Sequence, residues 1–179
     1  MWNLDSGGIF LNREKKTRGL KRKTKNLIQR LTEGTTEFPS EFWHGYWHLH
    51  LPCSQGFINS NKTPHAIKGL CLQTLVDRTK YLIDLKQSST DTIRVMSAID
   101  IPDIWSSQII VFSSESHYEG FFDRDNEEQQ WIPLPKERDL SREWQLILPD
   151  DMAIWGYLVK NFDEGDVYES ELWFIGEKD

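Results

Sequence analysis

The chain has 179 residues, which is enough for one domain with a hydrophobic core and too few for two ordinary domains. Eight tryptophans and nine phenylalanines exclude a disordered chain, because disordered chains lack aromatic side chains to bury. The net charge of −7 is unevenly distributed: residues 13–30 carry nine basic side chains against one acidic side chain, so the remaining sequence carries −15. Such an acidic surface repels phosphate, which disfavours nucleic-acid binding outside the basic segment.

The sequence also lacks signals for a membrane or an export pathway. No apolar run approaches the roughly 20 residues that span a bilayer, and the first residues do not form a secretory signal. The two cysteines, Cys53 and Cys71, form neither a disulfide framework nor a zinc-ribbon pattern. These features predict a cytoplasmic protein.

The first expected element is a basic helix. Residues 1–11 contain a Ser-Gly-Gly stretch and are expected to form a flexible arm, so that a single domain spans residues 12–179. From Arg13 to Leu31, apolar side chains recur at helical spacing among lysines and arginines. Gly34 is typical of a helix end.

The next segment, FWHGYWHLHLP at residues 42–52, alternates between two kinds of side chain, which predicts a strand. One face is expected to point into the core and carries Trp43, Trp47, Leu49 and Leu51. The other is expected to face water and carries His44, Tyr46, His48 and His50.

A second helix of about 22 residues is expected after Thr63, a favourable N-cap, and Pro64, which suits the first helical position. Its wide apolar face predicts that it lies across a sheet. Gly69 inside this helix costs roughly 1 kcal/mol relative to alanine, which suggests a close contact at that position.

The rest of the chain favours strands. Strands are expected within residues 92–102, 107–114 and 117–125 and in a hairpin with arms Ala153–Lys160 and Val167–Ile175. Residues 139–148 could be extended or could instead form a short helix capped by Ser141. The predicted fold class is therefore α+β, with the two helices of the N-terminal half packed on one face of a mostly antiparallel sheet of five to seven strands.

The imidazoles of the first strand are a candidate zinc site, formed by His44, His48 and His50. Alternate residues of a strand project the same way about 7 Å apart, and imidazole nitrogens bind Zn²⁺ at about 2.0–2.1 Å. A third ligand could come from Cys53, His117 or Glu119. A metal-dependent, hydrolase-like enzyme is therefore one alternative function, although a water-facing strand that merely carries imidazoles is favoured.

Other catalytic patterns are incomplete. His117 and Glu119 form an H-x-E pair without the downstream cysteine motif of zinc deaminases. Residues 123–128 start like a calcium loop but lack its glycine and its final glutamate. Nucleophile elbows, phosphate loops and H-E-x-x-H motifs are also missing. The sequence assigns no catalytic and no cofactor-binding residue.

The basic helix from Arg13 to Arg30 allows three interpretations. It could grip the phosphates of a nucleic acid, which is a second alternative function, although base-stacking aromatic residues are not interleaved with the charges. It could instead pair with the acidic body of its own chain or of a second subunit. It could also be an ordinary solvated face.

The function that the sequence favours is a non-enzymatic, acidic protein-binding module that occludes a partner with a basic surface, in the manner of immunity or antitoxin-type inhibitors. Aromatic anchors supply contact area and acidic side chains speed encounter with a basic target. The candidate partner-binding residues are Glu115, Tyr118, Glu119, Asp123, Asp163, Glu164 and Asp166.

Four segments together resemble a known family: REKKTRGLKRKTKNL, FWHGYWHLHLP, DDMAIWGYLVK and ELWFIGE. They look like an uncharacterised family of small bacterial proteins with a domain of unknown function. The resemblance covers residues 12–176 and implies a bacterial origin and one compact domain. It implies no catalytic residue.

Overall fold

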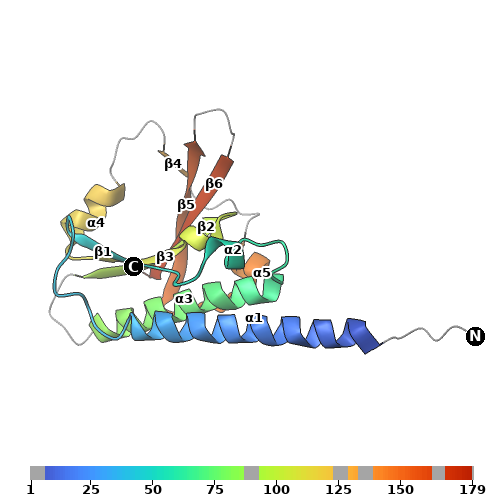
Figure 1. Cartoon of the computed structure of the whole chain (residues 1–179). Helices are drawn as coiled ribbons and strands as arrows, with labels where there is room; N and C mark the ends of the chain where they lie inside the picture. Colours follow the sequence, from blue (N-terminus) through green and yellow to red (C-terminus); the bar gives the residue numbers. More distant parts are fainter. Residues whose placement is uncertain (1–6, 87–92, 123–128, 133–138, 163–167, 179) are drawn as a thin grey trace, which may run out of the picture.

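The computed structural model describes the backbone of residues 7–86, 93–122, 129–132, 139–162 and 168–178 (Figure 1). Side chains are described for residues 19–86, 93–122, 139–156 and 171–178. Within these ranges, six strands form one sheet in the order β1-β3-β2-β6-β5-β4, and every pair of neighbours is antiparallel. The strands are β1 (Tyr46–His50), β2 (Arg94–Ile101), β3 (Gln108–Phe112), β4 (Gln129–Ile132), β5 (Met152–Phe162) and β6 (Tyr168–Glu177).

The two long helices are α1 (Gly7–Glu33) and α3 (His65–Lys86). Helix α1 begins at Gly7, so residues 7–11 are helical backbone and not part of the expected arm. Helix α3 has the predicted 22 residues. The carbonyl oxygen of Pro64 accepts hydrogen bonds from the amides of Ile67 and Lys68 in the first turn of the helix. The hydroxyl of Thr63, expected to cap α3, instead donates to the carbonyl oxygen of Phe57 at 2.5 Å.

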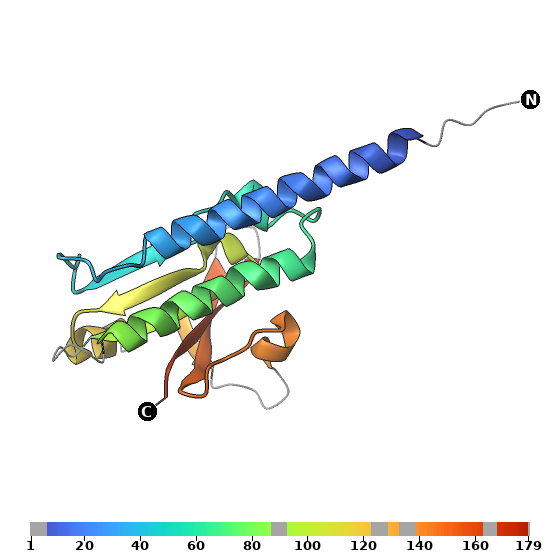
Figure 2. The same cartoon turned by 90° about the horizontal axis from the view of Figure 1, so that it is seen from below.

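Helices α1 and α3 lie side by side on one face of the sheet and run in the same direction (Figures 1 and 2). Their apolar faces and the facing strand residues form the main core. It includes Leu27 and Leu31 of α1, Leu72, Leu75 and Leu82 of α3, and Val95, Ile99, Ile109, Val111, Trp173 and Ile175 of the strands. The expectation of an α+β fold with two helices on one face of the sheet is confirmed.

The opposite face of the sheet carries a smaller core beneath α4 (Glu115–Phe122). Residues 117–125 were expected to form a strand, and this was wrong for residues 117–122, which are helical. Tyr118, Phe121 and Phe122 are spaced by three and four residues, so they form one helical stripe. The ring centroids of Phe121 and Phe122 lie 5.3 Å from that of Phe112 and 5.0 Å from that of Phe174, respectively.

Three short helices complete the described elements: α2 (Gln55–Ile58), the 3₁₀ turn η1 (Ile104–Ser106) and α5 (Leu140–Trp144). The expected helix within residues 139–148 is confirmed, but Asp139 caps it in place of Ser141 by accepting from the Arg142 amide at 3.1 Å. The close contact expected at Gly69 is also confirmed. A Cβ there would lie 2.9 Å from the carbonyl oxygen of Trp144.

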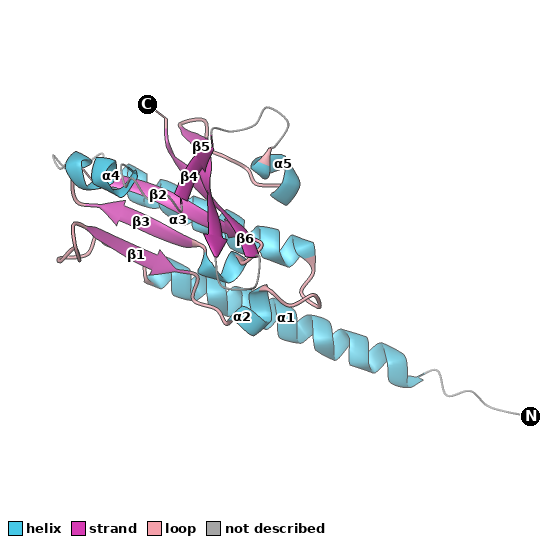
Figure 3. Cartoon of the chain, turned by 90° about the horizontal axis from the view of Figure 1, so that it is seen from above, coloured by secondary structure: helices cyan, strands magenta, loops and turns pink. Residues whose placement is uncertain are grey.

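The N-terminal part of α1 extends beyond the sheet and the other helices (Figures 1 and 3). An isolated helical stretch is marginal in water, because most helical stability in proteins comes from tertiary packing. The other described elements do not pack against the extended part.

Candidate functional site

A hollow lies between α1 and the segment that follows β1. It has a volume of about 440 Å³. Its lining consists of Lys23, Asn26, Leu27 and Arg30 from α1 and of Pro52, Cys53, Ser54 and Phe57 from the opposite wall. A second hollow of about 390 Å³ shares Lys23 and Phe57 with the first and adds Leu20, Gly56, Ser60, Lys62 and Thr63. We call the two hollows together the cationic groove.

Helical spacing positions the cations of the groove. Lys23 and Arg30 are seven residues apart, so they lie on one stripe of α1 with a rise of roughly 10 Å between them. Leu27 sits between them and packs into the main core, which fixes the rotation of the helix. The opposite wall holds Phe57, which is 6% exposed, and the Lys23 ammonium lies 5.7 Å from the centroid of its ring.

The groove is positively charged. Its lining contains three cations, Lys23, Arg30 and Lys62, and no acidic side chain. None of the three makes an ion pair within the described residues. A concave surface lined by one sign of charge concentrates ligands of the opposite sign, so this groove suits an anion.

The cysteine in the groove does not reduce this charge. Burial raises the pKa of the Cys53 thiol to about 11, so it is neutral at physiological pH. Burial and the neighbouring Cys53 raise the pKa of Cys71 to about 12, in keeping with its expected place on the apolar face of α3. Neither thiol has the lowered pKa of a catalytic nucleophile.

The other described cations of α1 are also without ion pairs. Lys21, Arg22 and Lys25 are exposed, and no carboxylate of the described chain pairs with them. The expected pairing of the basic helix with the acidic body of its own chain is therefore not formed among the described residues.

His44 does not lie on the strand where the alternation placed it. The amide of Tyr46 donates to the carbonyl of Trp43 at 3.1 Å, and His44 and Gly45 both have positive φ, +50° and +82°. Two successive positive φ values form a tight reversal, and β1 begins only at Tyr46. The expectation that Trp43 points inward was wrong, because this side chain is 69% exposed.

His48 and His50 do share one face of β1, with ring centroids 5.7 Å apart. That face of β1 is not fully exposed to solvent. The ring of Tyr46 beside them packs on Phe121. His48 is half-buried, and its Nδ1 atom has no hydrogen-bond partner among the described residues. Burial lowers the pKa of His48, and the neighbouring His50 lowers it further.

No group of three or more His, Cys, Asp or Glu side chains in the described ranges is arranged to hold a metal ion. The three candidate third ligands are dispersed. Cys53 lines the groove, Glu119 is exposed on α4, and the ring of His117 lies over Gly45. His117 Nδ1 is within hydrogen-bond distance of the hydroxyls of Ser113 (2.9 Å) and Ser114 (2.8 Å). A zinc site at His44, His48 and His50 stays a prediction.

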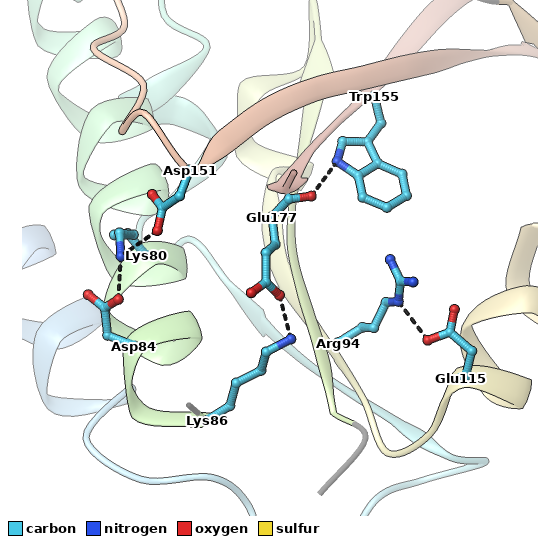
Figure 4. A network of polar contacts seen from close by, with 8 residues as sticks. All are labelled: Lys80, Asp84, Lys86, Arg94, Glu115, Asp151, Trp155 and Glu177. Carbon is cyan, nitrogen blue, oxygen red and sulfur yellow. Dashed lines mark hydrogen bonds and ion pairs between the residues drawn. The ribbon is translucent and has the colours of Figure 1, made fainter. Parts of the chain in front are cut away.

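Two of the candidate partner-binding residues have contacts inside the fold. Glu115 pairs with Arg94 at 2.7 Å between Oε2 and Nε (Figure 4). The guanidinium of Arg94 lies 4.5 Å from the ring centroid of Tyr118, which also packs on Phe112. Glu119 is exposed. The other four, Asp123, Asp163, Glu164 and Asp166, lie outside the described residues.

The fold and the groove define an α+β protein with an anion-attracting groove beside a long basic helix. Residues 28–177 match the family described as "Protein of unknown function (DUF3916)", and the chain belongs to this family. This confirms the resemblance seen in the sequence. The matched residues include Arg30 and the wall opposite α1, whereas Lys23 precedes them. Neither the curated proteins nor the solved structures yield a match to this chain.

Among the described helices, none combines the length and the apolar character that a bilayer crossing requires.

Proposed function

We propose that the protein binds nucleic acid, with the phosphate backbone lying in the cationic groove along α1. The observation that carries the proposal is a hollow lined by Lys23, Arg30 and Lys62, without an acidic side chain and without ion pairs within the described residues. Cations that are buried or ion-paired usually stabilise the fold and do not bind a ligand. Lysine and arginine side chains that are not used in ion pairs can neutralise the phosphates of a nucleic acid.

The length of the basic surface favours a polymeric anion over a small one. The nine basic residues of the segment extend from Arg13 to Arg30, which corresponds to roughly 25 Å of helix. Position 16 of the sequence is also a lysine and precedes Lys23 by seven residues, the same interval that separates Lys23 from Arg30. A single phosphate would contact only a few of the basic residues between Arg13 and Arg30.

Binding of labelled mixed-sequence oligonucleotides, measured by fluorescence anisotropy between about 0.05 and 0.2 M salt, tests the proposal. Three phosphate contacts in the groove predict a slope of log K against log salt of about −2 for a single strand. The double variant Lys23→Glu/Arg30→Glu should bind at least about tenfold more weakly and with a shallower slope.

The matched control is Arg142→Glu, which reverses one exposed charge on α5, away from the groove. It should leave the affinity within about twofold, because only the global charge changes. Absence of oligonucleotide binding by the unmodified protein at low salt would refute the proposal. Equal binding of an acidic polypeptide such as polyglutamate would also refute it and would assign the groove to an acidic protein.

Binding of a basic protein partner through acidic residues remains a separate proposal with less support. Glu115 and Tyr118 are occupied by Arg94, so Glu119 is the candidate among the described residues that is both acidic and exposed. An immunity-type function and a bacterial origin belong to the same proposal. A Glu119→Lys variant that loses a partner captured by the unmodified protein would support it.

A further inference from the structure

The position of Trp105 indicates which kind of nucleic acid the groove takes. Trp105 lies on η1, and 42% of it is exposed. Its indole Nε1–H donates to the carbonyl oxygen of Cys53 at 2.9 Å, and Cys53 lines the groove. A large aromatic side chain with much of its surface in solvent is therefore hydrogen-bonded to a residue that lines the hollow.

The surrounding hydrogen bonds hold this ring in place. The backbone amide of Trp105 donates to the side-chain oxygen of Asn59 at 3.3 Å. The Asn59 side chain also bonds the carboxylate of Asp103, the residue before η1. These contacts join η1 to the groove wall next to α2, so the indole is oriented before any ligand arrives, and stacking on it costs little ordering.

We infer that the ligand is a single-stranded nucleic acid and that Trp105 stacks on one of its bases. This inference rests on the proposed function. A cationic groove that follows the backbone, together with an exposed aromatic ring beside it, is the combination that binds single strands. In a duplex the bases are stacked on each other, and their faces are not open to a side chain at the rim.

The test compares thymidine and uridine oligonucleotides of about 16 nucleotides with a duplex of the same length by fluorescence anisotropy. The single strands should bind more tightly than the duplex. Trp105→Ala should weaken single-strand binding by about 5- to 150-fold, the range expected for one lost stacked base, while duplex binding changes little. Trp105→Phe, which keeps an aromatic face, should retain most of the affinity.

Trp43→Ala is the matched control, because Trp43 is 69% exposed but lies in the turn before β1. It should leave single-strand affinity unchanged. Affinity of Trp105→Ala within about twofold of the unmodified protein would overturn the inference. Similar affinities for DNA and RNA strands support stacking, and a preference for one of them identifies the sugar that the groove accepts.

A measurement on the unmodified protein covers the case in which Trp105→Ala fails to fold. An abasic oligonucleotide keeps the phosphates and lacks the bases, so it should bind more weakly than the thymidine strand. Equal affinity would overturn the inference and leave the proposed function standing. Absence of binding to every oligonucleotide would refute the proposed function itself, so the two failures are distinguishable.

Discussion

Helices α1 and α3 lie on the same face of the sheet, yet they use their cations differently. Lys80 and Lys86 of α3 form ion pairs with residues of the body (Figure 4). The charges of Lys80 and Lys86 hold elements of the fold together. The five described cations of α1 form no such pair within the described residues.

The α3 contacts reach both strands of the terminal hairpin. Lys80 lies 2.9 Å from the Asp151 carboxylate just before β5 and also bonds Asp84 on its own helix. Lys86 pairs with Glu177 at the end of β6 at 2.5 Å. The indole of Trp155 donates to the Glu177 carbonyl at 3.0 Å, so Glu177 joins α3, β5 and β6.

The first prediction tests whether both helices are anchored to the core despite this difference. Leu31 of α1 and Leu75 of α3 are fully buried. Leu31→Ala and Leu75→Ala should each lower the free energy of unfolding by about 2–5 kcal/mol, measured by urea denaturation. A much smaller loss for Leu31→Ala would mean that the C-terminal half of α1 is not packed on the body, and that the groove has no fixed wall.

The second prediction compares the effect on stability of replacing a glycine in each of the two long helices. Gly69→Ala on α3 should destabilise the protein by about 1–3 kcal/mol, because the new methyl group would press against the Trp144 carbonyl oxygen. Gly19→Ala on α1, where nothing lies within 4 Å, should stabilise it by about 0.5–1 kcal/mol. Thermal unfolding measures the change in stability of both variants. If both changes have the same sign, the predicted difference between the two glycines is wrong.

The third prediction compares paired with unpaired cations. Lys86→Met removes a partly buried ion pair and should cost about 0.5–1 kcal/mol. Lys23→Met should change stability by less than about 0.5 kcal/mol while it weakens oligonucleotide binding. If Lys23→Met destabilises as much as Lys86→Met, the α1 cations have a structural role.

The smallest expected effect is a pH dependence. Hydrogen bonds with Asp84 and Asp151 raise the pKa of Lys80 above 10.5, and the hydrogen bond from Lys80 lowers the pKa of Asp151 below 3.8. The carboxylate contribution is present above pH 3.8 and is lost as the pH falls through the lowered value. The lysine contribution is present below pH 10.5 and is lost as the pH rises through the raised value.

The difference in Tm between the unmodified protein and Lys80→Met should therefore be largest between these limits and shrink on either side. The corresponding difference for Lys23→Met should stay flat in acid, because Lys23 has no carboxylate partner among the described residues. A flat profile for Lys80→Met would show that the Lys80–Asp151 pair does not contribute in solution.

The elements with long periodic patterns were predictable from the sequence. The apolar stripe from Leu20 to Leu31 predicted α1, and Pro64 predicted the start of α3. The alternation of apolar and polar residues correctly predicted that Trp47 and Leu49 face the core. Helix α4 was missed because Tyr118, Phe121 and Phe122 fit a short strand as well as a helix. The sequence predicted the wrong position for His44. The alternation of apolar and polar residues does not reveal the turn that begins at Trp43.

The groove could be predicted only in part. The basic character of α1 is visible in the sequence, but the wall around Cys53, Phe57 and Lys62 carries no motif. Tertiary packing brings it beside Lys23, and no spacing along the chain reveals that contact. The stacking candidate Trp105 was missed for the same reason, since it is remote in sequence from the charges.

Gly45 links the first turn of the sheet to α4. A Cβ at position 45 would lie 2.2 Å from the ring of His117, and the positive φ already disfavours any other residue there. A side chain at this position would force the exposed ring of His117 to move. Reporter groups are therefore better attached at Gly120, where an added methyl meets no neighbour within 4 Å. Sequence libraries that diversify residues 43–46 should allow His117 to change with them.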